Sequence, residues 1–302
     1  MSRREPKGPP PTNRFAAWFL RPRVLLALAA MMFLAVLAPY APQLVPDLKQ
    51  DPAYRFDVRG VVIPPGPKWV PADLVKKSLE IEQDPLLTLL EPDLPREVAG
   101  RLKRHPWVAG VTRVAAQRDG TIQVDMTYRT PVAMVDTPKG SYPVDAEGVL
   151  LPPGDFTPQD ADLFPHVENA RTSPPALPGT AWTDPVVQGG AKIAARLVPD
   201  GDHERYWKRF GLARIVGPAN IHPSAGIDEI SFEIVTLSGS TIAWGKAPGS
   251  DALEPTVDQK IGRLQHYLTT YGSFDKPQGP YRIDIRGFDA ISLYPLDGQL
   301  YR

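Results

Sequence analysis

The sequence contains no cysteine, and this absence removes several classes of chemistry. Disulfides, zinc–thiolate sites, iron–sulfur clusters and cysteine nucleophiles all require a thiol, so none of them can form in this chain. Because proteins of every compartment can lack cysteine, its absence does not locate the protein.

The chain also has no net charge, with 34 basic and 34 acidic side chains among 302 residues. The strongly basic balance that favours nucleic-acid binding is therefore missing. The charges are unevenly placed, because residues 1–23 carry a net of +5 and the remainder a net of −5. The N-terminal segment is thus a short basic tail.

Motifs of catalysis and of cofactor binding are missing as well. The sequence has no GxSxG, no Walker A loop, no GxGxxG and no HExxH, and its five histidines are dispersed without an i, i+4 pair. We therefore expect no enzyme activity, no cofactor and no metal site.

One apolar run is long enough to raise the question of a membrane span. Residues 24–38 lack polar side chains. A helix over these residues alone would be ~22 Å long, which is shorter than the ~30 Å hydrocarbon core of a membrane, but a helix that continues to Val45 would be ~33 Å long and could cross it. The basic tail then places residues 1–23 in the cytoplasm and the chain after 45 outside. A retained transmembrane helix over 24–45 is favoured over a cleaved signal peptide or a buried core helix, because cleavage after Ala38 would leave Pro39 first.

The segment 54–140 has the pattern of a small antiparallel sheet backed by helices. Alternation over 54–62 predicts a strand, and prolines at helix starts precede two amphipathic helices, 74–81 and 94–104. A hairpin is predicted over 108–129, where Asp119-Gly120 separates two β-rich runs. The order is β-α-α-β-β, with one face buried and one in water.

The segment 141–296 is predicted to be a second mixed α/β domain with a C-terminal antiparallel sheet, so the overall fold class is α+β. It begins with a short strand pair and a proline-rich connector, 151–183, in which Leu163–Val167 can dock as a strand. The further elements that we expect are a helix from Pro185 to Leu197, weakened by Gly189 and Gly190; a hairpin of 227–237 with 240–244; a helix with the stripe Val257, Ile261, Leu264, Leu268 and Tyr271; and strands 281–286 and 290–294. Residues 297–302 form a C-terminal tail.

Several short motifs, in this order along the chain, resemble those of the FtsQ/DivIB family of bacterial cell-division proteins. They are Phe56-Asp57-Val58-Arg59-Gly60, Asp84-Pro85-Leu86-Leu87-Thr88-Leu89, His105-Pro106-Trp107-Val108, Arg129-Thr130-Pro131-Val132-Ala133, Tyr142-Pro143-Val144-Asp145-Ala146-Glu147-Gly148 and Arg282-Ile283-Asp284-Ile285-Arg286. The resemblance covers about residues 24–296. It departs from the family pattern in the proline-rich stretch 63–68 and in the segments 151–183 and 199–226, which are longer than we expect for the family.

The resemblance implies a POTRA domain over 54–140, a so-called β domain over 141–296 and a non-enzymatic scaffold in the cytoplasmic (inner) membrane at the division site. Its implied partners are FtsB- and FtsL-like division proteins at the β domain and further division proteins at the POTRA domain, without nucleic acid. A partner segment would add as a strand to the C-terminal sheet edge.

Candidate partner-binding residues follow from that implication. At the C-terminal strands they are Arg286 and Tyr294, with Tyr281, Asp284 and Phe288; in the POTRA domain they are Arg59, Arg129 and Pro131. Arginine and tyrosine are enriched at binding hot spots. Two interpretations of Arg286 stay open, a partner anchor and a structural ion pair with Asp284, and local charge pairing is the favoured interpretation of Asp284.

Two other functions compete with the scaffold. A POTRA-containing component of an envelope transport or secretion system would usually continue into a membrane barrel of many amphipathic strands, and the remaining residues include helices instead. A membrane-anchored periplasmic enzyme would need a convergent polar pocket with perturbed titratable groups, and the sequence shows no such constellation.

Overall fold

The computed structural model describes residues 22–38, 54, 56–79, 89–117 and 119–296. The chain divides into two units, Met1–Arg55 and Phe56–Arg302, each considered by itself. The expected tails 1–21 and 297–302, residues 39–45 of the expected membrane span and the motif residues Asp84–Thr88 lie outside the described residues.

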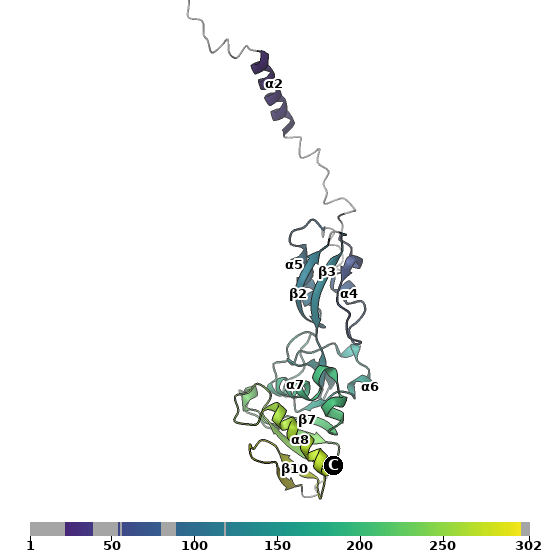
Figure 1. Ribbon diagram of the computed structural model, residues 1–302, viewed down its shortest axis with the longest axis vertical. Coiled ribbons are helices and arrows are strands. Elements are labelled where there is room, and N and C mark those ends of the chain that lie inside the picture. The colour runs from purple at the N-terminus through teal and green to yellow at the C-terminus, as the bar shows by residue number, and fades with distance from the viewer. Residues whose placement is uncertain (1–21, 39–53, 55, 80–88, 118, 297–302) are drawn as a thin grey trace, which may run out of the picture. The chain divides into compact units, whose positions relative to one another are not determined.

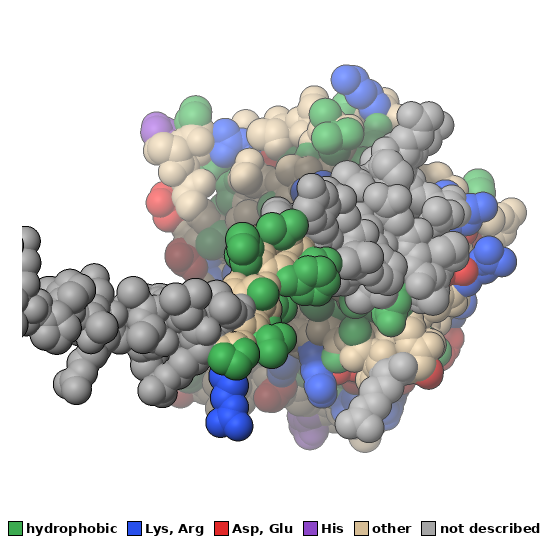
Figure 2. All heavy atoms as spheres, turned by 90° about the horizontal axis from the view of Figure 1, so that it is seen from above, with side chains coloured by type: hydrophobic (Ala, Val, Ile, Leu, Met, Phe, Trp, Pro, Cys, Tyr) green, Lys and Arg blue, Asp and Glu red, His purple; other side chains and the backbone are tan. Residues whose placement is uncertain are grey.

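In the N-terminal unit, the helix α2 (Pro22–Leu37) covers most of the apolar run (Figure 1). Its hydrophobic side chains are exposed on several sides, as the green spheres at the centre of Figure 2 show. None of the helices in the described ranges is long and apolar enough to cross a membrane.

The second unit contains two sheets, each with its own hydrophobic core. The first sheet has the strand order β1-β3-β2, with β1 parallel and β2 antiparallel to the central β3. Its elements in chain order are β1 (Val61–Val62), α4 (Leu74–Leu79), α5 (Leu94–Lys103), β2 (Val108–Ala116) and β3 (Ile122–Tyr128). The expected β-α-α-β-β order is confirmed.

The predicted first strand over 54–62 is wrong for most of its length. The structure has a 3-10 turn, η3 (Val58–Gly60), followed by a strand of only two residues. The Asp57 carboxylate accepts a hydrogen bond from the backbone N–H of Arg59 at 2.8 Å. This local bond gives the backbone an alternative to a strand, which alternation of residue types does not reveal.

The predicted hairpin is confirmed. Ile122, Val124 and Met126 of β3 are buried in the core of the first sheet, whereas Asp125 and Thr127 face solvent. Gly120 has φ +84°, which is the left-handed conformation that the Asp-Gly pair indicates.

The second sheet has eight strands in the order β11-β10-β9-β8-β7-β6-β4-β5. Its first strand in the chain, β4, was not predicted, and it begins before residue 141, where the second domain was expected to start. The strands are β4 (Pro131–Thr137), β5 (Gly140–Asp145), β6 (His166–Glu168), β7 (Leu212–Val216), β8 (Phe232–Thr236), β9 (Thr241–Gly245), β10 (Tyr281–Asp284) and β11 (Ser292–Pro295).

Within the proline-rich connector, β6 confirms that a strand docks there, since it lies parallel to both β4 and β7. Short helical turns fill the remaining connections. They are η4 (Pro153–Asp155), α6 (Pro158–Ala161), η5 (Pro199–Gly201), η6 (Glu204–Lys208) and η7 (Ile227–Glu229).

The helix α7 (Pro185–Leu197) has the predicted bounds and packs on the second sheet. It begins where the Asp184 carboxylate accepts a hydrogen bond from Val186 N–H at 2.9 Å. A Cβ atom at Gly189 would lie 2.6 Å from a ring carbon of Phe232, and one at Gly190 would lie 2.6 Å from Cγ1 of Val167. The two glycines therefore let the helix approach the sheet closely.

The helix α8 (Val257–Tyr271) begins at a capping box formed by Thr256 and Gln259 and ends at Gly272. Its predicted stripe is only partly right, because Ile261 and Leu264 are buried but Tyr271 is exposed. Lys260, which is not part of the predicted stripe, is buried, and its Nζ lies 2.7 Å from a carboxylate oxygen of Glu254. Figure 1 shows α8 beside the C-terminal strands.

Candidate protein-binding surface

The strand β11 is the outermost strand of the second sheet, and all four of its residues are exposed. It pairs antiparallel with β10, so that Arg282 lies opposite Tyr294 and Ile283 opposite Leu293. Since Ile283 is buried in the core, Leu293 lies on the α8 side of the sheet and Tyr294, with 56% of its surface exposed, on the open side. The two faces of β11 thus present different side chains.

The outer edge of β11 offers few hydrogen-bonding groups. The N–H of Leu296 donates to the Pro280 carbonyl at 3.0 Å, which continues the ladder with β10. Because inward and outward groups alternate along an antiparallel strand, Leu293 turns its N–H and C=O outward and Pro295 turns only a C=O outward. Pro295 has no N–H that could be left unpaired at this outward-facing position. Proline in an edge strand usually occupies such a position.

Arg286 and Asp284 form a close ion pair beside this edge. The guanidinium donates to the carboxylate from Nε at 2.9 Å and from Nη2 at 2.6 Å. The hydrogen bonds between the two side chains hold the pKa of Asp284 below its usual value. The same bonds raise the pKa of Arg286. Local charge pairing is therefore the role of Asp284, and Arg286 stays partly exposed while it is paired.

A second ion pair lies on the same open face. Arg282 donates from Nη2 to the Glu233 carboxylate of β8 at 2.6 Å. A cavity of about 250 Å³ between these strands is lined by Glu233, Ala243, Arg282 and Arg286, among others. The open face at the C-terminal strands is consequently polar and carries two partly exposed guanidinium groups.

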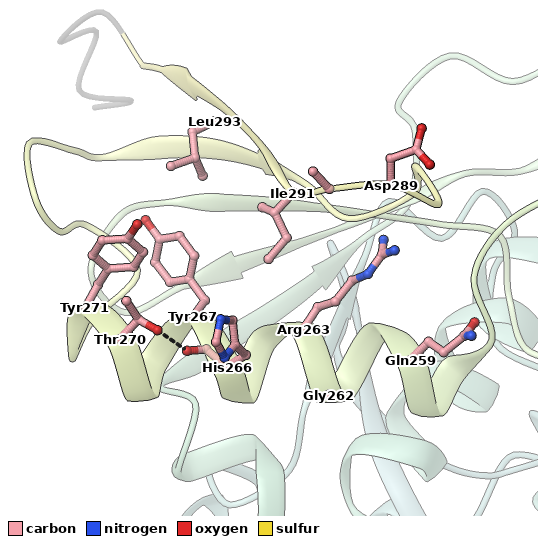
Figure 3. Close-up of a pocket in the computed structure, with 11 residues that line it drawn as sticks. Gln259, Gly262, Arg263, His266, Tyr267, Thr270, Tyr271, Asp289, Ile291 and Leu293 are labelled. Atoms are coloured by element: carbon pink, nitrogen blue, oxygen red, sulfur yellow. Dashed lines mark hydrogen bonds between the residues drawn. The ribbon is translucent and has the colours of Figure 1, made fainter.

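The α8 side carries a groove lined by both apolar and polar side chains, the polar ones including Arg263, His266 and Asp289. Figure 3 shows it between α8 and the β10–β11 region, with Tyr271 and His266 on the helix facing Ile291 and Leu293 on the strand side. The volume of the groove is about 580 Å³. Residues of α8 form one wall of the groove, and Asp289–Ile291 and Leu293 form the other.

Arg263 fixes the loop between β10 and β11. Its Nη1 donates to the Ile285 carbonyl at 3.0 Å and also to that of Gly287, and its Nη2 donates to the Phe288 carbonyl at 2.5 Å. Three main-chain oxygens therefore converge on one guanidinium. Sequence reasoning missed this residue, since an arginine between the stripe positions of a helix looks like an ordinary solvated side chain.

The other predicted C-terminal residues have contrasting environments. Tyr281 is buried, with its hydroxyl accepting a hydrogen bond from Gln278 N–H and its own N–H donating to Ser240 Oγ, each at 2.9 Å. Phe288 is 61% exposed in the loop that Arg263 holds. Phe288 can therefore contact a partner, whereas the side chain of Tyr281 belongs to the core.

The three candidates that were expected in the POTRA domain, Arg59, Arg129 and Pro131, are not brought together with the C-terminal group, and Pro131 lies in β4 of the second sheet. Arg59 is exposed and lies 3.4 Å from the Asp57 carboxylate. Arg129 is largely buried and donates from Nη1 to Asp145 at 2.6 Å, and Pro131 is buried in β4 opposite Asp145. Arg129 and Pro131 hold the junction of the two sheets.

No cluster of three or more histidine, aspartate or glutamate side chains within the described ranges has a geometry that could hold a metal ion. On the open face the structure brings together Arg282, Arg286 and Tyr294, whereas Leu293 lies on the α8 side of the same strand and Phe288 in the loop before it. Of these, Arg282 and Leu293 were not among the predicted site residues, although the alternating pattern of 281–286 already placed Arg282 on the outer face.

Comparison with known proteins gives one informative match. The chain is 28% identical over 237 residues to the cell division protein FtsQ of Salinibacter ruber, which covers 77% of this chain and 82% of the relative. No protein-family model matches the chain. The match confirms the resemblance to the FtsQ/DivIB family that the ordered motifs indicated.

Proposed function

We propose that this chain is a non-enzymatic, membrane-anchored scaffold of the bacterial cell-division machinery. The similarity to a cell division protein over most of both chains supports this function, and the ordered sequence motifs agree with it. The partners that the resemblance implies are FtsB- and FtsL-like division proteins.

The partner would bind by adding a strand to β11. The observation that carries this proposal is the exposed edge of β11, with the outward N–H and C=O of Leu293 flanked by exposed Tyr294 and by Arg286. Main-chain hydrogen bonds give affinity in strand addition, and pockets for alternate side chains give specificity. The groove beside α8 on one side and the guanidinium groups on the other would supply those contacts.

The anchor would be the apolar segment 24–45, with residues 1–23 in the cytoplasm and the larger part outside. The exposed hydrophobic side chains of α2 support it, because a helix that is apolar on all sides requires an apolar environment. The helix of 16 residues would span ~24 Å, and the sequence to Val45 would supply the remaining length.

The two sheets would act as a POTRA domain and a β domain. Their separate cores and the β-α-α-β-β order of the first sheet support this division. In the first sheet, Arg59 is the predicted residue that is exposed enough to contact a further division protein.

A fluorescent fusion of the full-length chain, imaged in growing cells, tests the proposed function. We expect enrichment at the constriction site before it closes. A variant in which residues 24–38 carry three lysines should lose that enrichment, because lysine at the centre of a membrane helix costs ~2.5–3.5 kcal/mol per residue. An even distribution of the wild-type fusion around the envelope would contradict the division role and favour an envelope transport component.

A further inference from the structure

We propose that residues 151–164, at the start of the proline-rich connector, are an acid-sensitive strap that holds the two sheets of the second unit together at neutral pH and releases them as the pH falls. The observation that carries the proposal is a row of aromatic rings across the junction of the sheets, with a histidine at each end. The inference goes beyond the proposed function, because it concerns how the two sheets are joined and not what they bind.

The row of rings runs from the first sheet through the strap to the second sheet. Trp107 lies in the core of the first sheet, and its ring centroid is 5.9 Å from that of Phe156 in the strap. Phe156 lies 6.0 Å from Phe164, which meets the edge of the His203 ring at 4.8 Å. His203 directly precedes η6, whose Trp207 lies in the core of the second sheet. The strap therefore connects the two cores through side-chain contacts.

At the first sheet, the row ends beside His105. The Nδ1 atom of His105 accepts a hydrogen bond from the Trp107 N–H at 3.3 Å, and the indole N–H of Trp107 donates to Asp155 of the strap at 2.7 Å. Only an unprotonated Nδ1 can accept, because both ring nitrogens of a charged histidine are donors. Burial lowers the pKa of His105; the carboxylates of Asp155 and Asp73 oppose this shift, and Lys77 adds to it.

At the second sheet, the row ends at a histidine nitrogen without a partner. The Nδ1 atom of His203 is buried and has no hydrogen-bond partner among the residues that the structure describes. A charge on this ring would therefore lack compensation at a buried atom. Burial lowers the pKa of His203. Lys208 and Lys68 lower it further, whereas Asp202 and Glu204 oppose the shift.

One of these lysines belongs to the other side of the junction. Lys68 precedes α4 in the chain, on the side of the first sheet, and the loop that carries His203 lies against its neighbour Trp69: a Cβ atom at Gly201 would lie 3.9 Å from the Trp69 ring. A protonated His203 would therefore repel a positive charge across the junction. Protonation thus acts against the contact between the sheets and not only within one of them.

Both histidines act in the same pH range. A histidine whose pKa is lowered in the closed junction stabilises closure fully above its ordinary value of 6.5 and loses that contribution as the pH falls through the lowered pKa. One pH unit below the ordinary value, each histidine can raise the open population by up to about tenfold. His166 has the opposite shift and loses its contribution above 6.5, so its effect lies in a separate pH range.

Hydrogen exchange of the full chain in detergent micelles tests the release. Amides of residues 153–164 include the Phe164 N–H, which donates to the Ala161 carbonyl at 3.1 Å. After correction for the intrinsic pH dependence of exchange, their protection should fall at least about tenfold between about pH 7.5 and about pH 5.5. The same protection at both pH values would overturn the inference.

The amides of α7 separate release of the strap from unfolding of the whole unit. They should stay at least about tenfold more protected than the strap amides at both pH values, because release leaves the second sheet folded. Equal protection of α7 and the strap would mean that the junction opens only when the unit unfolds, and this result would also overturn the inference.

Variants that do not titrate provide the matched comparison. His203→Phe keeps a ring against Phe164, and His105→Asn keeps a side-chain oxygen that can accept from the Trp107 N–H. In the chain with both substitutions, protection of the strap should change less than about twofold between the two pH values. A fall as large as in the wild-type chain would contradict the role of the two histidines.

The control variant is His222→Asn, at an exposed histidine whose Nδ1 lies 2.8 Å from the Ser224 hydroxyl. It should keep the full response of the wild-type chain, and loss of the response in this variant would contradict the assignment to the junction. The wild-type profile needs no substitution, so it decides the inference even if a variant fails to fold. The division role is decided separately, by the location of the fusion in cells.

Discussion

At the scale of single residues, Arg263 shows how one side chain sets the shape of the C-terminal edge. It reaches from the middle of α8 to three main-chain oxygens of the loop after β10. No sequence pattern links an arginine with carbonyl groups more than twenty residues away, so periodicity could predict the helix and not this contact.

Replacing Arg263 with alanine should loosen the β10–β11 loop. The substitution leaves three carbonyl oxygens without their donor, and we expect unfolding free energy to fall by about 1–3 kcal/mol. Urea unfolding of the full chain in detergent measures the change. Gln265→Ala on the exposed face of the same helix is the control and should have little effect; an equal loss in both variants would contradict the role of Arg263.

A histidine–carboxylate pair joins β6 to β4. His166 Nδ1 lies 3.0 and 2.9 Å from the two carboxylate oxygens of Asp136. The hydrogen bond to Asp136 raises the pKa of His166 above its ordinary value of 6.5, in opposition to burial. The pair therefore stabilises the fold fully below that ordinary value and loses its contribution as pH rises through the raised pKa.

As pH rises from the ordinary value of 6.5 through the raised pKa of His166, the wild-type chain should accordingly lose stability more steeply than His166→Gln. Glutamine keeps a side chain that can hydrogen-bond to Asp136 but does not titrate. Urea midpoints measured at several pH values give the two curves. Parallel curves would show that the pair does not couple folding to protonation.

At the scale of elements, α7 was predicted with its correct bounds because its signals are local. Asp184 and Pro185 mark its start, and both act within one turn. The two glycines looked like weaknesses of the helix, and only the structure shows Phe232 and Val167 filling the space that their side chains would occupy.

Gly189→Ala and Gly190→Ala should each destabilise the fold by about 1–3 kcal/mol, despite the better helix propensity of alanine, because the added methyl group overpacks the core. Gly262→Ala in α8 is the matched control, since a Cβ there meets no atom within 4 Å. That variant should be neutral or stabilised by up to ~1 kcal/mol. Thermal unfolding of the three variants measures the difference, and stabilisation of all three would contradict the packing argument.

Two elements show why local patterns fail elsewhere. The strand β4 is a run of buried residues between two neighbouring strands, and such central strands lack the alternation that marks a half-exposed strand. In α8, Lys260 is buried because Glu254, from the preceding loop, supplies an opposite charge. Both features depend on partners outside the element.

At the scale of the whole second unit, contacts distant in sequence join the two sheets. Leu151, which follows β5, is buried in the core of the first sheet, and the Trp107 indole N–H donates to the Asp155 carboxylate at 2.7 Å. The sequence predicted two groups of elements and a proline-rich connector, but it held no signal that the start of the connector packs under the first sheet.

Leu151→Ala should therefore destabilise the first sheet although the residue lies beyond it in the chain. We expect a loss of about 2–5 kcal/mol, detected as faster hydrogen exchange in the peptides of β2 and β3. Leu177→Ala, at an exposed leucine in the same connector, should leave those peptides unchanged. Unchanged exchange in Leu151→Ala would mean that the two cores are independent.

The central claim is that a partner strand adds to the outer edge of β11, and one pair of variants tests it most directly. Leu293→Pro removes the outward N–H that a partner strand would use, and an edge strand tolerates proline at such a position, whereas Leu293→Ala shortens the same side chain and keeps the N–H. The measurement is the constriction-site fluorescence of a tagged late division protein in cells that depend on each variant. The account predicts at least about tenfold weaker recruitment with Leu293→Pro than with Leu293→Ala, with both variants folded and at the membrane. Equal recruitment by the two variants would contradict it.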